Sequence, residues 1–400
     1  HSGNLPNLVK SGYTGPIHAV SASAHLTEIM LQDSGHIQES SVRHLNYRRA
    51  KRGQEPVEPL YTQEDAAKTA SQLVEHNYNE VIEPIPGVQA RFVDAGHILG
   101  SAQIVLDLEE NGRKVRFWFS GDIGRPQMAL IRDPIMPDRA DYLLMECTYG
   151  DRPHSSPDQA YVELRNQIKL ALDRGGKVII PAFAVGRTQE LVYNIHKMMD
   201  AGDIPSVPVF VDSPLAVNVT DIFRAHPECF DAEALQMIES DKHRAALGFD
   251  RLTYIRSVDE SKALNERKDP MIIISASGMM EVGRVLHHLE HSIDDPNSVV
   301  LIVSWMAPHT LGRRLADGEE RVKIFGEVYE RKIRVANVHG FSAHAGQNLL
   351  LDYALHLKDS AKEVFFVHGE ERAALALNEK FEGAGMQPAH YPSWGSSADL

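Results

Sequence analysis

Five histidines and acids lie where loops would present them to a common site. Each has glycine or serine nearby: His97 in DAGHILGSA, Asp122 in FSGDIGR, Glu146 in MECTYG, His344 in HGFSAH and His368 in FFVHGE. Loops at strand ends often carry functional side chains, and neutral imidazole is the commonest metal ligand. A single histidine of this kind is more often structural, so the prediction of a metal site depends on the recurrence.

These residues suit hydrolysis assisted by two metal ions. Ions about 3.5–4 Å apart need imidazole ligands and a carboxylate that bridges them, and Asp122 has the chemistry for the bridge. A water between the ions has a lowered pKa and becomes a hydroxide that can attack phosphorus at neutral pH. The pattern therefore favours phosphodiester hydrolysis without a nucleophile from the protein.

The elements that must position these residues begin with a mixed α/β region. Residues 63–77 have the apolar spacing of an amphipathic helix, and strands are predicted at 90–96 and 140–150. Between these strands, 104–119 has apolar runs on both sides of an Asn-Gly pair at 111–112, which predicts a hairpin.

From about residue 155 the pattern changes to helices that alternate with short apolar strands. The strands are KVIIPAF (177–183), VPVFVD (207–212), MIIISAS (271–277) and VVLIVS (299–304). Such alternation predicts parallel βαβ units. A hairpin-like segment, RVKIFGEVYERKIRVANV, then leads to a helix near 346–357, a strand at 362–369 and a final helix.

The composition excludes several classes of protein. The chain has 400 residues, enough for two or three domains. It has no apolar stretch that could cross a bilayer and no signal peptide at its start, so we expect a cytoplasmic location. Cys147 and Cys229 are too few for a disulfide framework. The net charge of −14 argues against non-specific coating of nucleic acid, although a nuclease needs only a local positive groove.

The motifs resemble, in order, those of the β-CASP branch of the metallo-β-lactamase fold, which includes RNA-cleaving enzymes. They are GHILGSA, SGDIG, ECTYG, PAFAVGRTQE, SASGMMEVGR, TLGRRL, GFSAH and VHGE. The resemblance implies an α/β protein: a metallo-β-lactamase αββα sandwich with an inserted β-CASP domain that contains a parallel sheet. The expected boundaries are 1–150 for the first part of the sandwich, 151–334 for the β-CASP domain and 335–400 for the C-terminal part.

The resemblance also implies roles for individual residues. His97, Asp122 and His368 match metal ligands, with Asp122 bridging two zinc ions and so taking part in catalysis. Glu146 matches an acid that orients a histidine, and His344 matches the histidine that contacts the scissile phosphate and protonates the leaving oxygen. A carboxylate suits that task because it fixes the tautomer of the ring and favours its charged form.

The chain departs from the family pattern at its start. The family signature HxHxDH precedes SGxLP, whereas this chain begins with HSGNLP. His1 therefore matches the last histidine of the signature and is expected to be a further metal ligand. Since the two earlier histidines, the aspartate and the preceding strands are absent, we expect a truncated sequence.

Two strand-to-helix turns are candidates for binding substrate phosphates. In PAFAVGRTQE, Arg187 and the helix N-terminus could bind a phosphate, and the alternative is a salt bridge of Arg187 in an ordinary connection. The SASGMMEVGR turn is of a type that binds anions. Its candidates are Ser275, Ser277, Gly278 and Arg284.

The segment SWMAPHTLGRRL is a weaker candidate. Trp305 and His309 could stack on bases and Arg313 could hold a phosphate, as in proteins that bind single strands. A tryptophan after an apolar strand is usually buried, however, and related proteins carry Gly-Tyr-Gln at 304–306. His339 is expected to be structural. The remaining histidines are expected at the surface: His18, His25, His36, His44, His287, His288 and His291.

The predicted function is zinc-dependent cleavage of phosphodiester bonds in single-stranded RNA. Endonuclease action is expected, while exonuclease action and homodimer formation are left open, and no membrane partner is expected. One alternative is a metallohydrolase for small esters or thioesters, against which the large middle domain argues. Another is a non-catalytic RNA-binding paralogue, which would have no chemical reason to keep all five residues of the site.

Overall fold

The computed structural model describes residues 2–154, 156–240, 247–338 and 340–398. The chain divides into two compact units, His1–Ile82 and Glu83–Leu400, and each is described by itself. Among the described residues, no helix combines the length and the apolar character that crossing a membrane requires.

The first unit is built around a long helix that the sequence does not predict. Its elements are η1 (Ser2–Asn4), α1 (Leu5–Lys10), β1 (Ile17–Val20), α2 (Ser21–Ala50), α3 (Gln63–Ala70) and β2 (Leu73–His76). Gly35 in the middle of α2 packs against the start of α3, because a Cβ there would lie 2.9 Å from backbone atoms of Thr62 and Gln63. Thr62 caps α3 in a reciprocal pair with Asp65.

The predicted helix over 63–77 is wrong in its second half. It ends at Ala70, and Leu73–His76 instead form β2, which pairs in parallel with β1. Short apolar runs such as Leu73-Val74 fit helix and strand equally well by periodicity. Leu73–His76 form a strand because they pair with Ile17–Val20, which lie more than fifty residues earlier in the chain.

A mixed sheet begins the second unit. Among the described residues it has six strands in the order β16-β7-β6-β5-β4-β3. Their bounds are β3 (Val81–Ile85), β4 (Val88–Asp94), β5 (Ala102–Glu110), β6 (Arg113–Phe119), β7 (Tyr142–Glu146) and β16 (Glu363–Val367). The predicted hairpin is confirmed: β5 and β6 are antiparallel, and Asn111 and Gly112 between them have φ of 52° and 78°.

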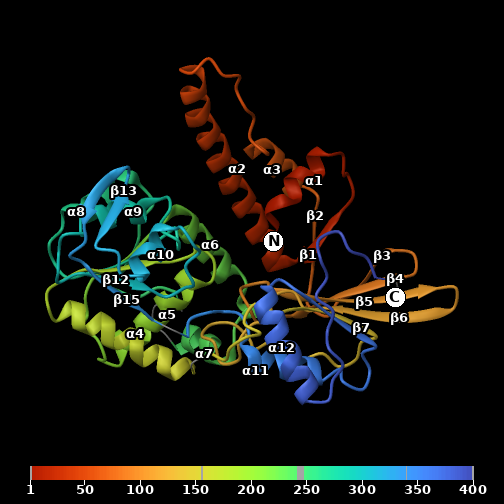
Figure 1. Cartoon of the computed structure of the whole chain (residues 1–400). Coiled ribbons are helices and arrows are strands. Elements are labelled where there is room, and N and C mark those ends of the chain that lie inside the picture. Colours follow the sequence, from red (N-terminus) through yellow and green to blue (C-terminus); the bar gives the residue numbers. More distant parts are fainter. Residues whose placement is uncertain (1, 155, 241–246, 339, 399–400) are drawn as a thin grey trace. The chain divides into compact units, whose positions relative to one another are not determined.

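The strand directions of the mixed sheet bring four carboxyl ends to one edge. β16, β7 and β6 are mutually parallel, and β5 runs antiparallel to both β6 and β4. β4 therefore points the same way as β6. Helices α11 (Gln347–Leu355) and α12 (Glu371–Gly383) lie beside this sheet in Figure 1. Tyr353 of α11 and Phe381 of α12 join Trp118 and Phe366 of the strands in one buried core.

A parallel sheet forms the middle of the second unit, as predicted. Among the described residues its strand order is β10-β9-β11-β8-β12-β15, and every pairing is parallel. The bounds are β8 (Val178–Pro181), β9 (Val209–Asp212), β10 (Leu252–Tyr254), β11 (Ile272–Ser275), β12 (Val299–Ile302) and β15 (Arg334–Asn337). β8, β9, β11 and β12 are buried along their whole length, as continuous apolar runs in parallel sheets usually are.

Helices and one hairpin surround the parallel sheet. They are α4 (Pro157–Leu172), α5 (Arg187–Asp200), α6 (Pro214–Ala225), η2 (Pro227–Cys229), α7 (Ala232–Ser240), α8 (Val258–Glu266), α9 (Arg284–Glu290), α10 (Leu311–Ala316), β13 (Arg321–Ile324) and β14 (Glu327–Glu330). Of the hairpin-like segment expected near 321–338, only β13 and β14 pair as a hairpin, because β15 joins the parallel sheet.

Candidate active site

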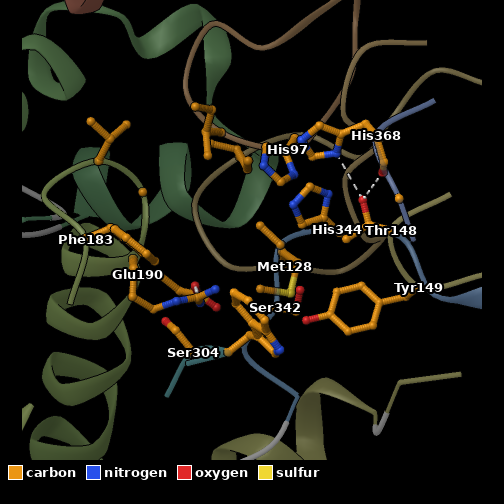
Figure 2. A pocket seen from close by; sticks show the side chains of 18 of the residues that line it. His97, Met128, Thr148, Tyr149, Phe183, Glu190, Ser304, Ser342, His344 and His368 are labelled. Atoms are coloured by element: carbon orange, nitrogen blue, oxygen red, sulfur yellow. Dashed lines mark hydrogen bonds and ion pairs between the residues drawn. The ribbon is translucent and has the colours of Figure 1, made fainter. Parts of the chain in front are cut away.

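The carboxyl edge of the mixed sheet collects the acids and histidines singled out from the sequence. His97 follows β4, Asp122 follows β6, Glu146 ends β7 and His368 follows β16. His344 comes from the loop before α11, and its backbone forms an isolated antiparallel β-bridge with Gly124. Figure 2 shows the imidazoles of His97, His344 and His368 gathered in one place.

Glycines allow the loops that carry His97 and Asp122 to touch through their backbones. Gly124 N donates to Ala95 O at 2.8 Å, and a Cβ on Gly124 would collide with Gly96 O. Gly96 has φ of 61°, and a Cβ there would lie 2.4 Å from Pro134 N. Both loops therefore need glycine where the sequence has it.

His97 is held by its own loop and kept neutral. Its backbone N donates to Ser101 Oγ at 2.9 Å, which fixes the turn. Burial, together with the nearby charge of His344, lowers the pKa of His97 to about 4. Its Nδ1 is buried without a hydrogen-bond partner among the described residues. A neutral ring is the form that a metal ligand requires.

Asp122 lies between two imidazoles and presents one oxygen to each. Its Oδ2 is 3.9 Å from His97 Nε2, and its Oδ1 is 3.4 Å from His368 Nδ1. A carboxylate shared in this way matches the arrangement that a bridging ligand needs. His368 itself is positioned by Thr148, whose Oγ1 donates to His368 O at 2.9 Å and lies 3.1 Å from His368 Nδ1. We did not single out Thr148 from the sequence, although it stands two residues after Glu146 in the ECTYG motif.

Buried Glu146 and half-buried His344 form a pair. Both carboxylate oxygens of Glu146 lie 3.1 Å from His344 Nδ1, and Glu146 Oε1 also accepts from Ile123 N at 2.6 Å. Burial lowers the pKa of His344, but the hydrogen bond and charge of Glu146 and the charge of Asp122 outweigh it, so the pKa is raised. The pairing fixes the proton at Nδ1 and leaves Nε2 for other partners.

The residues at this edge fit a metal centre. One ligand atom each of His97, Asp122 and His344 lies within 4.8 Å of the others, and the same holds for Glu146, His344 and His368. Glu146 already engages His344, whereas Asp122 lies next to both His97 and His368, so these three remain the candidate metal ligands. The expected ligand His1 lies outside the described residues.

The site opens into a cavity of about 610 Å³. Its lining includes His97, His344 and His368 from the mixed-sheet side and Phe183 and Trp305 from loops of the parallel sheet. In Figure 2, Phe183 enters from the side opposite to the imidazoles. The cavity is thus bounded by the carboxyl edges of both sheets.

Comparison with known proteins assigns this arrangement to a family. Residues 188–315 match the Beta-Casp domain, and residues 328–392 match the Zn-dependent metallo-hydrolase RNA specificity domain. A Thermus thermophilus protein named Ribonuclease TTHA0252 is 33% identical over 389 residues, which cover 97% of this chain and 83% of that protein. The chain belongs to the β-CASP family. Its fold is the metallo-β-lactamase fold with an inserted β-CASP domain.

Two archaeal relatives also match this β-CASP chain. The protein named Transcription termination factor FttA of Cenarchaeum symbiosum is 30% identical over 416 residues, covering 100% of this chain and 60% of that protein. The RNase J-like protein of Methanocaldococcus jannaschii is 31% identical over 321 residues, covering 79% of this chain and 72% of that protein. The chain therefore spans less than two thirds of the termination factor's length.

In this β-CASP chain, Arg187 lies at the cavity but is already paired. It begins α5 after Gly186, is 8% exposed and forms an ion pair with Glu190. Its guanidinium also lies 5.6 Å from the centre of the Phe341 ring. The salt bridge weighed as the alternative from the sequence is thus present, although Arg187 still lines the cavity.

Most of the candidate side chains in SASGMMEVGR form hydrogen bonds within the protein and do not face the cavity. Ser275 is buried and its Oγ donates to Asp212 O at 2.9 Å, while Arg284 NH1 donates to Asp212 Oδ1 at 2.6 Å. Ser277 is half-buried, with its Oγ 3.4 Å from Glu281 N. None of these three lines the 610 Å³ cavity in the part of the chain that the structure describes. Gly278 is buried against Phe183.

The expectation that His288 lies at the surface is wrong. Its side chain is 0% exposed, with Nε2 2.6 Å from Asp212 Oδ2 and Nδ1 2.7 Å from Asn265 Oδ1. His288 lies in the short helix α9, and the side of α9 that carries it packs against Asp212 at the end of β9. His339 lies outside the described residues.

The expectation that Trp305 is buried is also wrong. Its side chain is 52% exposed and lines the cavity. The strand β12 ends at Ile302 and its apolar run at Val303, so Trp305 belongs to the loop beyond the sheet and not to the core. Arg313 lies elsewhere: its Nε donates to both oxygens of Asp317, and it lines a neighbouring cavity of about 460 Å³.

Proposed function

We propose that this β-CASP chain cleaves phosphodiester bonds within single-stranded RNA, with zinc held by His97, Asp122 and His368. His344 donates the proton to the leaving oxygen, and Glu146 positions it. The observation that carries the proposal is that the Glu146–His344 pair lies beside Asp122, His97 and His368, and that the three imidazoles line one cavity. The names of relatives that cleave RNA support the substrate class.

Each residue has a separate task in this scheme. Asp122 presents one oxygen toward His97 and the other toward His368, which suits two zinc ions in one site. Such ions supply Lewis acidity, which lowers the pKa of water and offsets negative charge on the phosphate. His344 keeps a proton on Nδ1 for Glu146 and presents Nε2 to the cavity, where it can protonate the oxygen that leaves.

The shape of the site favours this substrate over a small ester. The cavity reaches from the mixed sheet to loops of the parallel sheet, so its lining extends well beyond the donor set. A non-catalytic RNA-binding role would leave the hydrogen bonds that Glu146 accepts from His344 and Ile123 without a purpose in chemistry. Endonuclease preference, homodimer formation and a cytoplasmic location stay predictions.

The test compares His344→Ala with His356→Ala, an exposed histidine next to α11. Both variants and the wild type are incubated with a labelled single-stranded RNA and with the same RNA in a duplex. The wild type should cleave the single strand, and His344→Ala should lose about 10²–10⁴-fold in rate, the usual contribution of a general acid. Cleavage by His344→Ala at the wild-type rate, or preference for the duplex, contradicts the proposal.

A further inference from the structure

Two exposed aromatic side chains occupy one wall of the active-site cavity. Phe183 stands two residues after β8 and Trp305 three residues after β12. Because β8 and β12 pair in parallel, their carboxyl ends lie at the same edge of the sheet. Phe183 is 46% exposed and Trp305 is 52% exposed, and both line the cavity that contains His344.

The loops that carry these rings pack against the loop after β11, although the rings themselves are exposed. Gly278, after β11, packs against Phe183, because a Cβ there would lie 3.4 Å from the ring carbons. Ala307 N lies 3.4 Å from Met279 Sδ, which ties the Trp305 loop to the Gly278 loop. The loops that carry the two rings are therefore packed against the loop after β11, while the rings themselves line the cavity.

The charged groups of the same cavity are neutralised by one another. Arg187 pairs with Glu190, Arg152 and Arg372 both pair with Asp151, and Glu370 in the same lining supplies the third negative charge. The net charge of −14 further weakens attraction of a polyanion. Apolar ring surface is thus what this wall offers a ligand, and an aromatic ring stacks on any nucleobase because every base has a π face.

Trp305 also lines the neighbouring cavity of about 460 Å³. Arg313 lies there, with its guanidinium on Asp317. Because Trp305 lines both cavities, a strand that leaves the metal donors can pass Trp305 and continue into the second cavity. This continuity fits a nucleic acid that extends through both cavities.

We infer that Trp305 and Phe183 form a stacking platform for an unpaired nucleobase of the RNA, next to the scissile phosphate. The inference rests on the proposed function and makes its substrate class more specific. The platform selects unpaired bases without reading their identity, because stacking uses the face of a base and not its hydrogen-bonding edge. A base within a duplex has both faces covered and cannot use it.

The first test uses the fluorescence of Trp305 and needs no cleavage. The chain has three tryptophans; Trp118 is buried and Trp394 is fully exposed, so Trp394→Phe provides the background. A 2′-deoxy single-stranded oligonucleotide should quench the remaining emission, and the additional change Trp305→Ala should remove the quenching. An oligonucleotide with abasic sites throughout should not quench. Equal quenching with and without Trp305, or with and without bases, overturns the inference.

The second test measures cleavage of single-stranded RNA. Trp305→Ala should raise KM about tenfold, the effect of losing one stacked base, with kcat changed little, and Trp305→Tyr should restore most of the loss. Phe183→Leu should act in the same direction, while the matched control Phe325→Leu, equally exposed in the turn between β13 and β14, should not. In a series of substrates with one abasic site each, one position of that site should give the wild type and Trp305→Ala the same KM.

Failure of this inference differs from failure of the proposed function. If the wild type cleaves RNA but Trp305→Ala has the same KM, and no abasic position separates the two proteins, the platform is wrong while the nuclease assignment stands. If the wild type does not cleave RNA at all, the nuclease assignment fails. The quenching experiment then still decides whether Trp305 stacks on bases.

Discussion

The mixed sheet and the parallel sheet both place acids and histidines at the carboxyl ends of their strands, yet the two clusters differ in how far their hydrogen bonds are satisfied. Asp212 of β9 accepts from Ser261 and Arg284, and His288 lies 2.6 Å from it, with no exposure of either side chain. At the mixed sheet, His97 and His344 line a cavity instead. Residues of the same type thus form a sealed network in one place and an accessible site in the other.

The difference in exposure distinguishes a functional site from a structural hydrogen-bond network. Saturated buried polar groups stabilise a fold, while groups that face a cavity remain available to a ligand. Arg284 illustrates the point, because its guanidinium donates to Asp212 and to the backbone oxygen of Arg256. The anion-binding role expected for Arg284 from its loop would compete with these bonds.

The largest expected effect is on catalysis at the mixed sheet. Asp122→Ala should lower the rate of RNA cleavage by roughly a thousandfold or more, because metal-ion catalysis contributes several kcal/mol. The free energy of unfolding should change by less than about 1 kcal/mol, as for most substitutions outside a core. Single-turnover cleavage and urea unfolding measure the two effects, with Asp359→Ala, an exposed position after α11, as control. Activity within tenfold of the wild type would contradict the assigned role of Asp122.

The second effect is on stability at the parallel sheet. Asp212→Ala leaves Arg284 and His288 without their carboxylate, and breaking a buried ion pair costs about 3–5 kcal/mol. Urea denaturation should show this loss. Asp221→Ala, which removes a half-exposed partner of Arg224, should cost less than about 1 kcal/mol. If Asp212→Ala lowers the free energy of unfolding as little as Asp221→Ala does, the cluster around Asp212 is not a stabilising network.

The third effect concerns the positioning of His344. Glu146→Gln keeps the shape of the side chain but removes its charge, so cleavage should fall by about 10–100-fold, as for other residues that orient a functional group. The fall should be smaller than that of His344→Ala. Glu379→Gln, exposed on α12, is the control, and cleavage rates as a function of pH are the measurement. A pH profile identical to that of the wild type would argue against the positioning role.

The smallest expected effect is a dependence of stability on pH. Burial raises the pKa of Asp212, but the hydrogen bonds from His288, Ser261 and Arg284 outweigh it, so the pKa is lowered on folding. Asp212 therefore adds stability above the pKa of an unfolded aspartate, near 3.9, and this contribution is lost as pH falls through the lower folded value. The difference in unfolding free energy between wild type and Asp212→Asn should shrink below about pH 4. A constant difference from pH 3 to pH 7 would exclude this linkage.

Much of the fold could be predicted because local sequence determines it. The runs at 177–183 and 299–304 are short and rich in β-branched residues, which favours buried strands, and Asn111-Gly112 fits the turn of its hairpin. Residues 21–50 gave no such signal, because polar residues interrupt the apolar ones and Gly35 stands in the middle. The close approach of α3 at Gly35 explains the glycine, and periodicity does not reveal it.

The site shows a similar division. The spacing of motifs brought His97, Asp122, Glu146, His344 and His368 to attention, and the structure places all five at one edge. The exposure of Trp305 and the burial of His288 could not be predicted, because each depends on where a strand stops or a helix packs. Phe183 stood in a quoted motif, and only its exposure in the cavity gives it a possible role.

The most direct test of the central claim is the zinc content per chain after dialysis against metal-free buffer, measured by elemental mass spectrometry. Our account assigns Asp122 to the metal and His344 to the proton. It predicts that Asp122→Ala loses bound zinc, whereas His344→Ala keeps the wild-type content although it cleaves RNA poorly. Zinc lost from His344→Ala and retained by Asp122→Ala would contradict that division of roles.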